Sequence, residues 1–172
     1  MPSAAMQQKL NDQVKHEFYA SFVYLSMAAW LDARNLPGMA NWMRVQAGEE
    51  HAHALKIYEH LLDRGAPVVL QTIPQPPVQF TSPLEVFEYA LHHEQGVTQS
   101  IHAIYRQAVE DADYASQVFL GWFVTEQVEE EKSAGLAVEQ LRMAGDDRSA
   151  ILLLDREFAS RQPEAAGGEA AD

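Results

Sequence analysis

Four long segments of the chain each place one glutamate near the middle of a helical stripe that is otherwise largely apolar. Apolar residues recur in these segments at alternating steps of three and four, the spacing of helices with one face turned to a core. The four glutamates are Glu17, Glu50, Glu94 and Glu130. Carboxylates are rarely buried without a partner, because desolvation and like charge both oppose ionisation. A fold that buries these faces together must therefore neutralise four acidic groups.

Proline, glycine and capping residues divide the sequence into five expected helices. Pro37 occupies a favoured first helical position, and Gly65 is the kind of residue found just past a helix end. Ser82 and Glu85 have the spacing of a capping box, with a proline at the first helical position between them. The expected ranges are about 3–34, 37–65, 82–111, 113–145 and 147–158.

The lengths of the helices and of their connections favour an all-α four-helix bundle. Three connections are short, which places consecutive helices side by side and antiparallel. The fourth connection, residues 66–82, is long enough at about 3.3 Å per residue to run the length of the bundle. We therefore expect a long crossover between the second and third helices and a short fifth helix at the C-terminal end. Residues 1–158 would form one domain, followed by a low-complexity, disordered tail over 159–172.

Composition limits the function classes. The formal net charge of −13 would repel nucleic acid and anionic membranes and attract metal cations, so neither a nucleic-acid nor a membrane partner is expected. The chain has no cysteine, which excludes disulfides and thiol chemistry and fits a reducing compartment. It has neither the basic start and apolar run of a signal peptide nor an uncharged apolar stretch of membrane-spanning length. A cytoplasmic location is expected.

A shared metal centre is the simplest way to neutralise the four carboxylates. No lysine or arginine lies beside them on the four stripes. Several oxygens with one or two imidazoles suit iron, manganese or zinc, and four carboxylates balance about two divalent ions. The alternative, an ordinary polar network in the core, must explain why each long helix carries one carboxylate at a matching depth.

The spacing of the polar residues matches a known way of holding two metals in a bundle: one Glu from each of two helices and Glu-x-x-His from each of the other two. Glu17 and Glu94 match the first pair, and Glu50 with His53 matches one Glu-x-x-His. The fourth helix departs from the pattern, because residues 127–130 read Gln-Val-Glu-Glu, with Gln for Glu and Glu for His.

The surroundings of these residues resemble those of the non-haem bacterial ferritins over nearly the whole chain. The segments that carry the resemblance are EFYASFVYLSMAAW, AGEEHAHALKIYEHLLDRG and GWFVTEQVEEEKSAG. The resemblance implies that the bundle, with its long crossover and short fifth helix, has the ferritin-like fold. It also implies that Glu17, Glu50 and His53 hold one iron. It implies that Glu94 and Glu130 hold a second iron, with Glu50 bridging both. Gln127 would then be a nearby hydrogen-bonding side chain, and no haem is expected.

The resemblance extends to residues beside the two-iron centre. Glu49, Glu126 and Glu129, with Glu130, resemble a third iron site, although acidic runs such as EQVEEE are commonly a solvated helix face. Tyr24 lies two helical turns from Glu17, where it would donate a hydrogen bond or an electron; the alternative is a buried tyrosine that only satisfies its hydroxyl. Trp122 also has a family-like position, with simple packing as the alternative.

Two enzymatic functions and one non-enzymatic function fit these residues. The resemblance implies an iron-storage ferritin with ferroxidase activity. Such a protein oxidises Fe(II) with O2 or H2O2 and stores Fe(III) as a mineral in a homo-oligomeric shell of 24 subunits. The alternative is a non-storage di-iron oxidase or peroxidase of the rubrerythrin-like type, which would be a small particle. A helical scaffold with a structural metal is a third reading. Particle mass separates the first two, and iron turnover separates both from the third.

Overall fold

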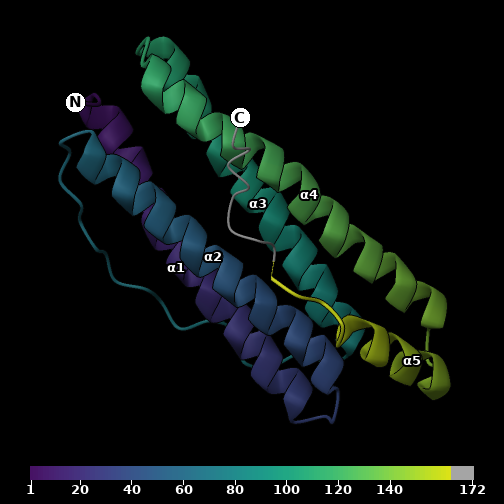
Figure 1. The fold of residues 1–172 in the computed structure, drawn as a ribbon. Coiled ribbons are helices and arrows are strands. Elements are labelled where there is room, and N and C mark those ends of the chain that lie inside the picture. The colour runs from purple at the N-terminus through teal and green to yellow at the C-terminus, as the bar shows by residue number, and fades with distance from the viewer. Residues whose placement is uncertain (164–172) are drawn as a thin grey trace.

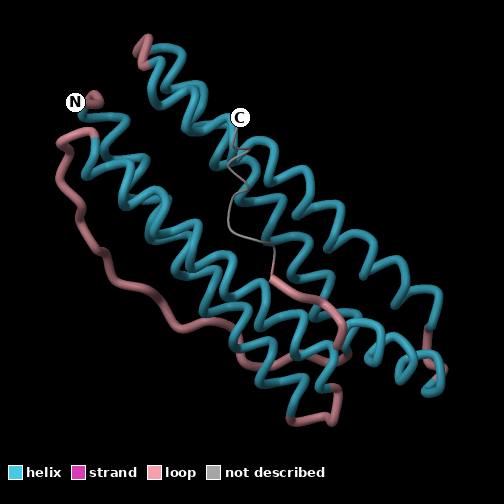
Figure 2. Tube along the Cα trace, viewed as in Figure 1, coloured by secondary structure: helices cyan, strands magenta, loops and turns pink. Residues whose placement is uncertain are grey.

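The computed structural model describes residues 1–163 and contains five helices, which Figure 1 shows as a bundle with one short extra helix at its end. Their bounds are α1 Ala4–Asp32, α2 Pro37–Asp63, α3 Pro83–Glu110, α4 Tyr114–Ala144 and α5 Arg148–Phe158. All regular structure in these residues is helical (Figure 2). The expected fold class is confirmed, and each boundary lies within two residues of its expected place. Residues 164–172, most of the expected tail, lie outside the described part.

Side-chain caps explain why the helices begin where they do. Ser3 caps α1, Asp113 caps α4 and Asp147 caps α5, each by accepting backbone N–H bonds of the first turn. At α3, Ser82 Oγ accepts from the N–H of Glu85 at 3.1 Å, as the capping box predicts. The Glu85 carboxylate, however, accepts from the N–H and hydroxyl of residue 81, one position earlier than the box requires.

The long connection between α2 and α3 crosses the bundle from one end to the other, so α3 runs parallel to α2 (Figure 1). Helix α1 holds this crossover at two places. Asn11 donates from Nδ2 to the carbonyl of Pro67 at 3.1 Å and accepts from the N–H of Val69 at 2.6 Å. Further along, Ser26 donates to the carbonyl of Pro77 at 2.6 Å. The crossover therefore packs against the bundle along its length.

Two apolar clusters fill the bundle, one towards each end. The cluster at the α5 end includes Met27, Met43 and Phe87, and the other includes Leu10 and Phe123. The polar stripe residues of the four long helices fall between the clusters. Burial of both clusters stabilises the bundle and holds this polar layer at a fixed depth inside it.

Helix α5 docks against the beginning of α2 through an unusually close backbone approach. A Cβ atom added at Gly38 would lie 1.6 Å from the carbonyl oxygen of Asp155, so only glycine fits there. The Asp155 side chain accepts from the N–H of Met39 at 2.8 Å. Leu36, the N-cap of α2, makes no side-chain cap hydrogen bond, so Asp155 performs that role from another helix. Residues 159–163, which follow α5, are thereby directed along α2.

None of the helices in residues 1–163 is both long and apolar enough to cross a membrane.

Candidate metal centre

The four long helices bring the polar stripe residues together in one buried layer. None of the six side chains concerned is more than 5% exposed, although all are polar or charged. Helix α1 supplies one of them, α2 two, α3 one and α4 two; they are Glu17, Glu50, His53, Glu94, Gln127 and Glu130.

Two carboxylate oxygens in this layer have no hydrogen-bond donor among the described residues. Glu17 accepts from Gln13 Nε2 at 2.8 Å through Oε1, but its Oε2 atom is buried and unpartnered. Glu50 Oε1 is likewise buried without a partner. Leaving a buried polar atom unsatisfied costs about 1 to 3 kcal/mol, and more for a charged group. A bound cation would satisfy both oxygens at once.

His53 stands between two groups of carboxylates. Its Nδ1 atom lies 3.8 Å from Glu50 Oε2, and its Nε2 atom lies 3.9 Å from Glu126 Oε1. Ligand atoms of Glu17, Glu50 and His53 all lie within 4.8 Å of one another, and so do those of His53, Glu126 and Glu130. The first group is the one expected for the first iron. The second differs from expectation, because it joins Glu126, assigned from the sequence to a third site, to two residues of the central layer.

Glu94 belongs to neither group, and each of its oxygens accepts a hydrogen bond. Tyr24, which is fully buried, donates from its hydroxyl to Glu94 Oε1. Gln127 Nε2 lies 3.3 Å from Glu94 Oε2. Tyr24 therefore donates to a carboxylate of the layer, and its partner is on α3.

Trp122 packs directly on the imidazole of the layer. Its ring centroid lies 5.3 Å from that of His53 in an edge-on arrangement, and the Lys56 ammonium lies 4.2 Å from the Trp122 ring centroid. Such a contact fixes the plane of the His53 ring, so packing explains the position of Trp122.

Arg161, in the segment after α5, brings a positive charge to the edge of the layer. Glu130 Oε2 accepts from Gln46 Nε2 at 2.7 Å, and Gln46 Oε1 in turn accepts from Arg161. Arg161 Nη2 also lies 3.0 Å from Glu49 Oε2. No cation lies on the four stripes, as the sequence indicated, yet Arg161 supplies one from the segment after α5. This residue falls within the range 159–172 that the sequence assigned to a tail.

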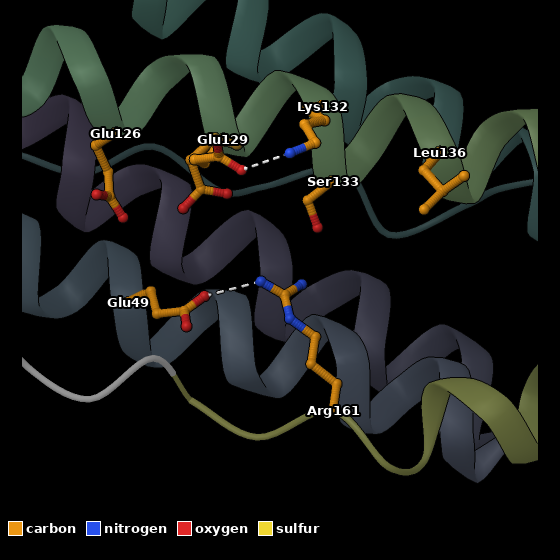
Figure 3. A pocket seen from close by; sticks show the side chains of 8 residues that line it. Glu49, Glu126, Glu129, Lys132, Ser133, Leu136 and Arg161 are labelled. Carbon is orange, nitrogen blue, oxygen red and sulfur yellow. Dashed lines mark hydrogen bonds and ion pairs between the residues drawn. The ribbon is translucent and has the colours of Figure 1, made fainter.

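The four glutamates of the expected third site line one pocket of about 200 Å³ between α2 and α4 (Figure 3). Arg161 enters it from the C-terminal segment, and Lys132 on α4 pairs with Glu129 at 3.2 Å at its edge. The complete lining is Glu49, Glu126, Glu129, Glu130, Lys132, Ser133, Leu136 and Arg161.

Burial and mutual repulsion raise the pKa values of Glu50, Glu94 and Glu130. The pKa of Glu50 is raised well above its ordinary value, first by burial and then by neighbouring carboxylates. Burial raises the pKa of Glu94 to about 7 against the opposing hydrogen bond from Tyr24, and that of Glu130 to about 8. The pKa of the Tyr24 phenol is also raised well above 10 by burial. A cation that binds here must therefore displace protons from these carboxyls.

Comparison with known proteins identifies the family. A family model described as a ferritin-like domain matches residues 7–144. The chain belongs to the ferritin family. A protein of Staphylococcus saprophyticus named bacterial non-heme ferritin is 42% identical over 152 residues, which are 88% of this chain and 91% of that protein. A protein of the same name from Staphylococcus aureus is 39% identical over 161 residues, which are 94% of this chain and 97% of that protein.

Solved ferritin structures agree with this fold over almost the whole chain. An open-pore ferritin from the hyperthermophilic archaeon Archaeoglobus fulgidus superposes with a TM-score of 0.93 at 44% sequence identity, and the match covers 94% of this chain and 99% of that one. The resemblance to the non-haem bacterial ferritins stated from the sequence is thereby confirmed, as is the ferritin-like bundle with its crossover and fifth helix.

Proposed function

We propose that the protein is an iron-storage ferritin that oxidises Fe(II) at a two-iron centre inside each subunit. The observation that carries this proposal is a pair of buried oxygens, Glu17 Oε2 and Glu50 Oε1, which have no donor within residues 1–163 and belong to side chains grouped with His53. The apolar clusters on either side of the layer give no reason for these carboxylates to be there. A pair of bound cations would explain these carboxylates, because the cations satisfy the oxygens and balance their charge.

Each helix has a role in this centre. Glu17 and His53 hold one iron, Glu94 and Glu130 hold the other, and Glu50 bridges them. Two Fe(II) held roughly 3.5 to 4 Å apart deliver one electron each to one molecule of O2 or H2O2. Glu94 and Glu130 release protons as Fe(II) enters, since their raised pKa values favour the protonated form before the metal binds. Gln127 and Tyr24 hold the Glu94 carboxylate in place through hydrogen bonds.

The acidic pocket beside the centre is the third iron site in this proposal. Its ligands are Glu49, Glu126, Glu129 and Glu130. Glu130 lies at the boundary of both sites, and Glu126 approaches His53, so an ion in the pocket is adjacent to the two-iron centre. No haem takes part.

Storage of the oxidised iron requires a container, and we propose a homo-oligomeric shell of 24 subunits in the cytoplasm. Support comes from the relatives named ferritin and from α5, whose Leu152 and Leu153 are exposed and offer apolar surface to a neighbouring subunit. The net charge of −13 favours attraction of Fe(II) to the particle.

The test adds two Fe(II) per subunit to metal-free protein in air and follows the Fe(III) absorbance and O2 uptake. Wild-type protein is expected to oxidise the iron rapidly, and Glu50→Gln to lose the rapid phase because the bridging charge is gone. Glu59→Gln makes the same change at an exposed position of the same helix and is expected to match wild type.

Particle mass decides between storage and the non-storage alternative. Light scattering is expected to give 24 times the subunit mass of 19.3 kDa. Rapid oxidation on a particle of one or two subunits would instead indicate a rubrerythrin-like oxidase. Equal rates in wild type and Glu50→Gln would contradict the two-iron centre.

A further inference from the structure

The segment that follows α5 carries its arginine to the acidic pocket by a defined set of contacts. Asn41 on α2 donates from Nδ2 to the backbone carbonyl of Arg161 at 3.1 Å and lies 3.4 Å from that of Ala159. The guanidinium carbon of Arg161 lies 4.2 Å from the centroid of the Trp42 ring. Both the backbone and the side chain of this residue are therefore held against α2.

The guanidinium uses this position to contact the acidic groups. Arg161 Nη2 pairs with Glu49 Oε2 at 3.0 Å, and the two side chains are only 18% and 12% exposed. The same nitrogen donates to Gln46, which donates to Glu130 at 2.7 Å. Arg161 Nη1 is buried without a hydrogen-bond partner among the described residues. In Figure 3 the Arg161 guanidinium points to the Glu49 carboxylate.

A metal ion in the pocket and this guanidinium compete for Glu49 Oε2. Glu49 Oε2 cannot accept the Arg161 hydrogen bond and coordinate a cation along the same direction, and two positive charges at this separation repel each other. Lys132 does not compete equally, because its side chain is 73% exposed and its charge is screened by solvent. The Arg161 charge is better shielded from water, and it is tethered, so it has a high local concentration at the pocket.

We propose that Arg161 is a tethered counter-ion that occupies the acidic pocket and lowers its affinity for a third cation, which must displace the guanidinium to bind. The inference rests on the proposed function, since it assigns to Arg161 the control of the site beside the two-iron centre. It makes Arg161 a residue that determines the occupancy of this site rather than a ligand.

Calorimetric titration of metal-free protein with Zn²⁺ alone tests the proposal, because Zn²⁺ binds without oxidation and no activity is needed for the measurement. Arg161→Gln keeps hydrogen-bonding capacity but removes the charge. We expect its third Zn²⁺ to bind about tenfold more tightly than in wild type, which corresponds to about 1.4 kcal/mol. The first two ions should bind within twofold of wild type. Arg161→Lys, which keeps the charge, should stay near wild type.

Two further variants separate charge from structure. Arg156→Gln removes one positive charge from the exposed surface of α5 and should bind all three ions like wild type. Asn41→Ala keeps Arg161 but removes its backbone anchor, so the third ion should bind more tightly here too. This variant tests the proposal even if Arg161→Gln does not fold, which melting curves and particle mass will reveal.

The outcomes distinguish the two proposals. The role of Arg161 is overturned if the third Zn²⁺ binds with unchanged or weaker affinity in both Arg161→Gln and Asn41→Ala while the first two ions still bind. That result leaves the two-iron centre intact. A similar gain in Arg156→Gln also overturns it, because the effect would then be one of net charge. Absence of the first two binding events in wild type overturns the proposed function itself.

Discussion

Gln13 donates a hydrogen bond from Nε2 to Glu17 Oε1 at 2.8 Å, while its own Oε1 accepts from Ser100 Oγ at 2.5 Å. This chain of two hydrogen bonds links α3 to α1 and fixes the orientation of the Glu17 carboxylate. The second oxygen of Glu17 is thereby left facing the layer without a donor among the described residues. Outer hydrogen bonds of this kind orient metal ligands and tune their basicity.

Gln13→Leu should therefore slow Fe(II) oxidation without removing any proposed ligand. Leucine has a similar volume but cannot hold the Glu17 carboxylate, and losses of 10- to 100-fold in metal affinity or activity are typical for such changes. The initial rate at two Fe(II) per subunit measures the effect. Gln8→Leu, at an exposed position of the same helix, is the control. Equal rates in the two variants would contradict the role of Gln13 in orienting the Glu17 carboxylate.

Tyr24→Phe should impair the centre through Glu94. The substitution deletes the hydroxyl that donates to Glu94 Oε1 and leaves that buried oxygen without this donor. Since the hydrogen bond lowers the pKa of Glu94, its loss should raise that pKa above about 7. Binding of Fe(II) should then need a higher pH, so the rate–pH profile should move upwards. Tyr114→Phe, at an exposed tyrosine, should leave the profile in place.

The metal-free protein should lose stability as the pH rises above neutrality. Glu94 and Glu130 have folded-state pKa values of about 7 and about 8, above the ordinary 4.5. A carboxyl whose pKa is raised by folding contributes its full stabilisation at pH values below its unfolded-state pKa. This contribution is lost as the pH rises through its folded-state pKa. Between pH 6.5 and 9 the loss should be about 3 kcal/mol, as an order of magnitude.

Urea unfolding of the metal-free protein at the two pH values measures this loss. Glu130→Gln should remove the larger share of the pH dependence, because a neutral amide cannot titrate. Added Zn²⁺ should also reduce it, since the ion replaces the protons. A metal-free protein that is more stable at pH 9 than at pH 6.5 would contradict the assigned burial of these groups.

Gly38→Ala should displace α5. The added Cβ would lie 1.6 Å from the carbonyl oxygen of Asp155, and backbone cannot move aside as a flexible side chain can. We expect a loss of about 3 kcal/mol or more in the free energy of unfolding. Gly48→Ala is an informative control, since a Cβ there meets nothing within 4 Å. In a helix interior that change should stabilise by about 0.5 to 1 kcal/mol. Equal melting temperatures in the two variants would contradict the close approach.

The helices and the buried polar layer could be predicted because their signals are local and periodic. Ser82 and Pro83 mark the start of α3, and regular spacing carries one glutamate on each long helix to a similar depth. The length of the crossover determines that α3 runs parallel to α2. These features need no knowledge of which helix touches which.

The residues that the sequence missed act between elements that are distant along the chain. Arg161 follows α5 in a stretch without periodicity, and its role depends on how α5 docks. Asp155 caps α2 from α5, and the missing acceptor at Leu36 was the available clue. Gln13 precedes Glu17 by four residues on the same helix face, a spacing that permits their hydrogen bond and could have identified it.

The most direct test of the two-iron centre is a crystal of the protein soaked anaerobically in Fe(II), with anomalous differences recorded at the iron absorption edge. Two peaks are expected in the buried layer of each subunit, roughly 3.5 to 4 Å apart. The side chains around them should be Glu17, Glu50, His53, Glu94 and Glu130. Iron peaks found only on the surface, with the buried layer free of iron, would contradict the central claim.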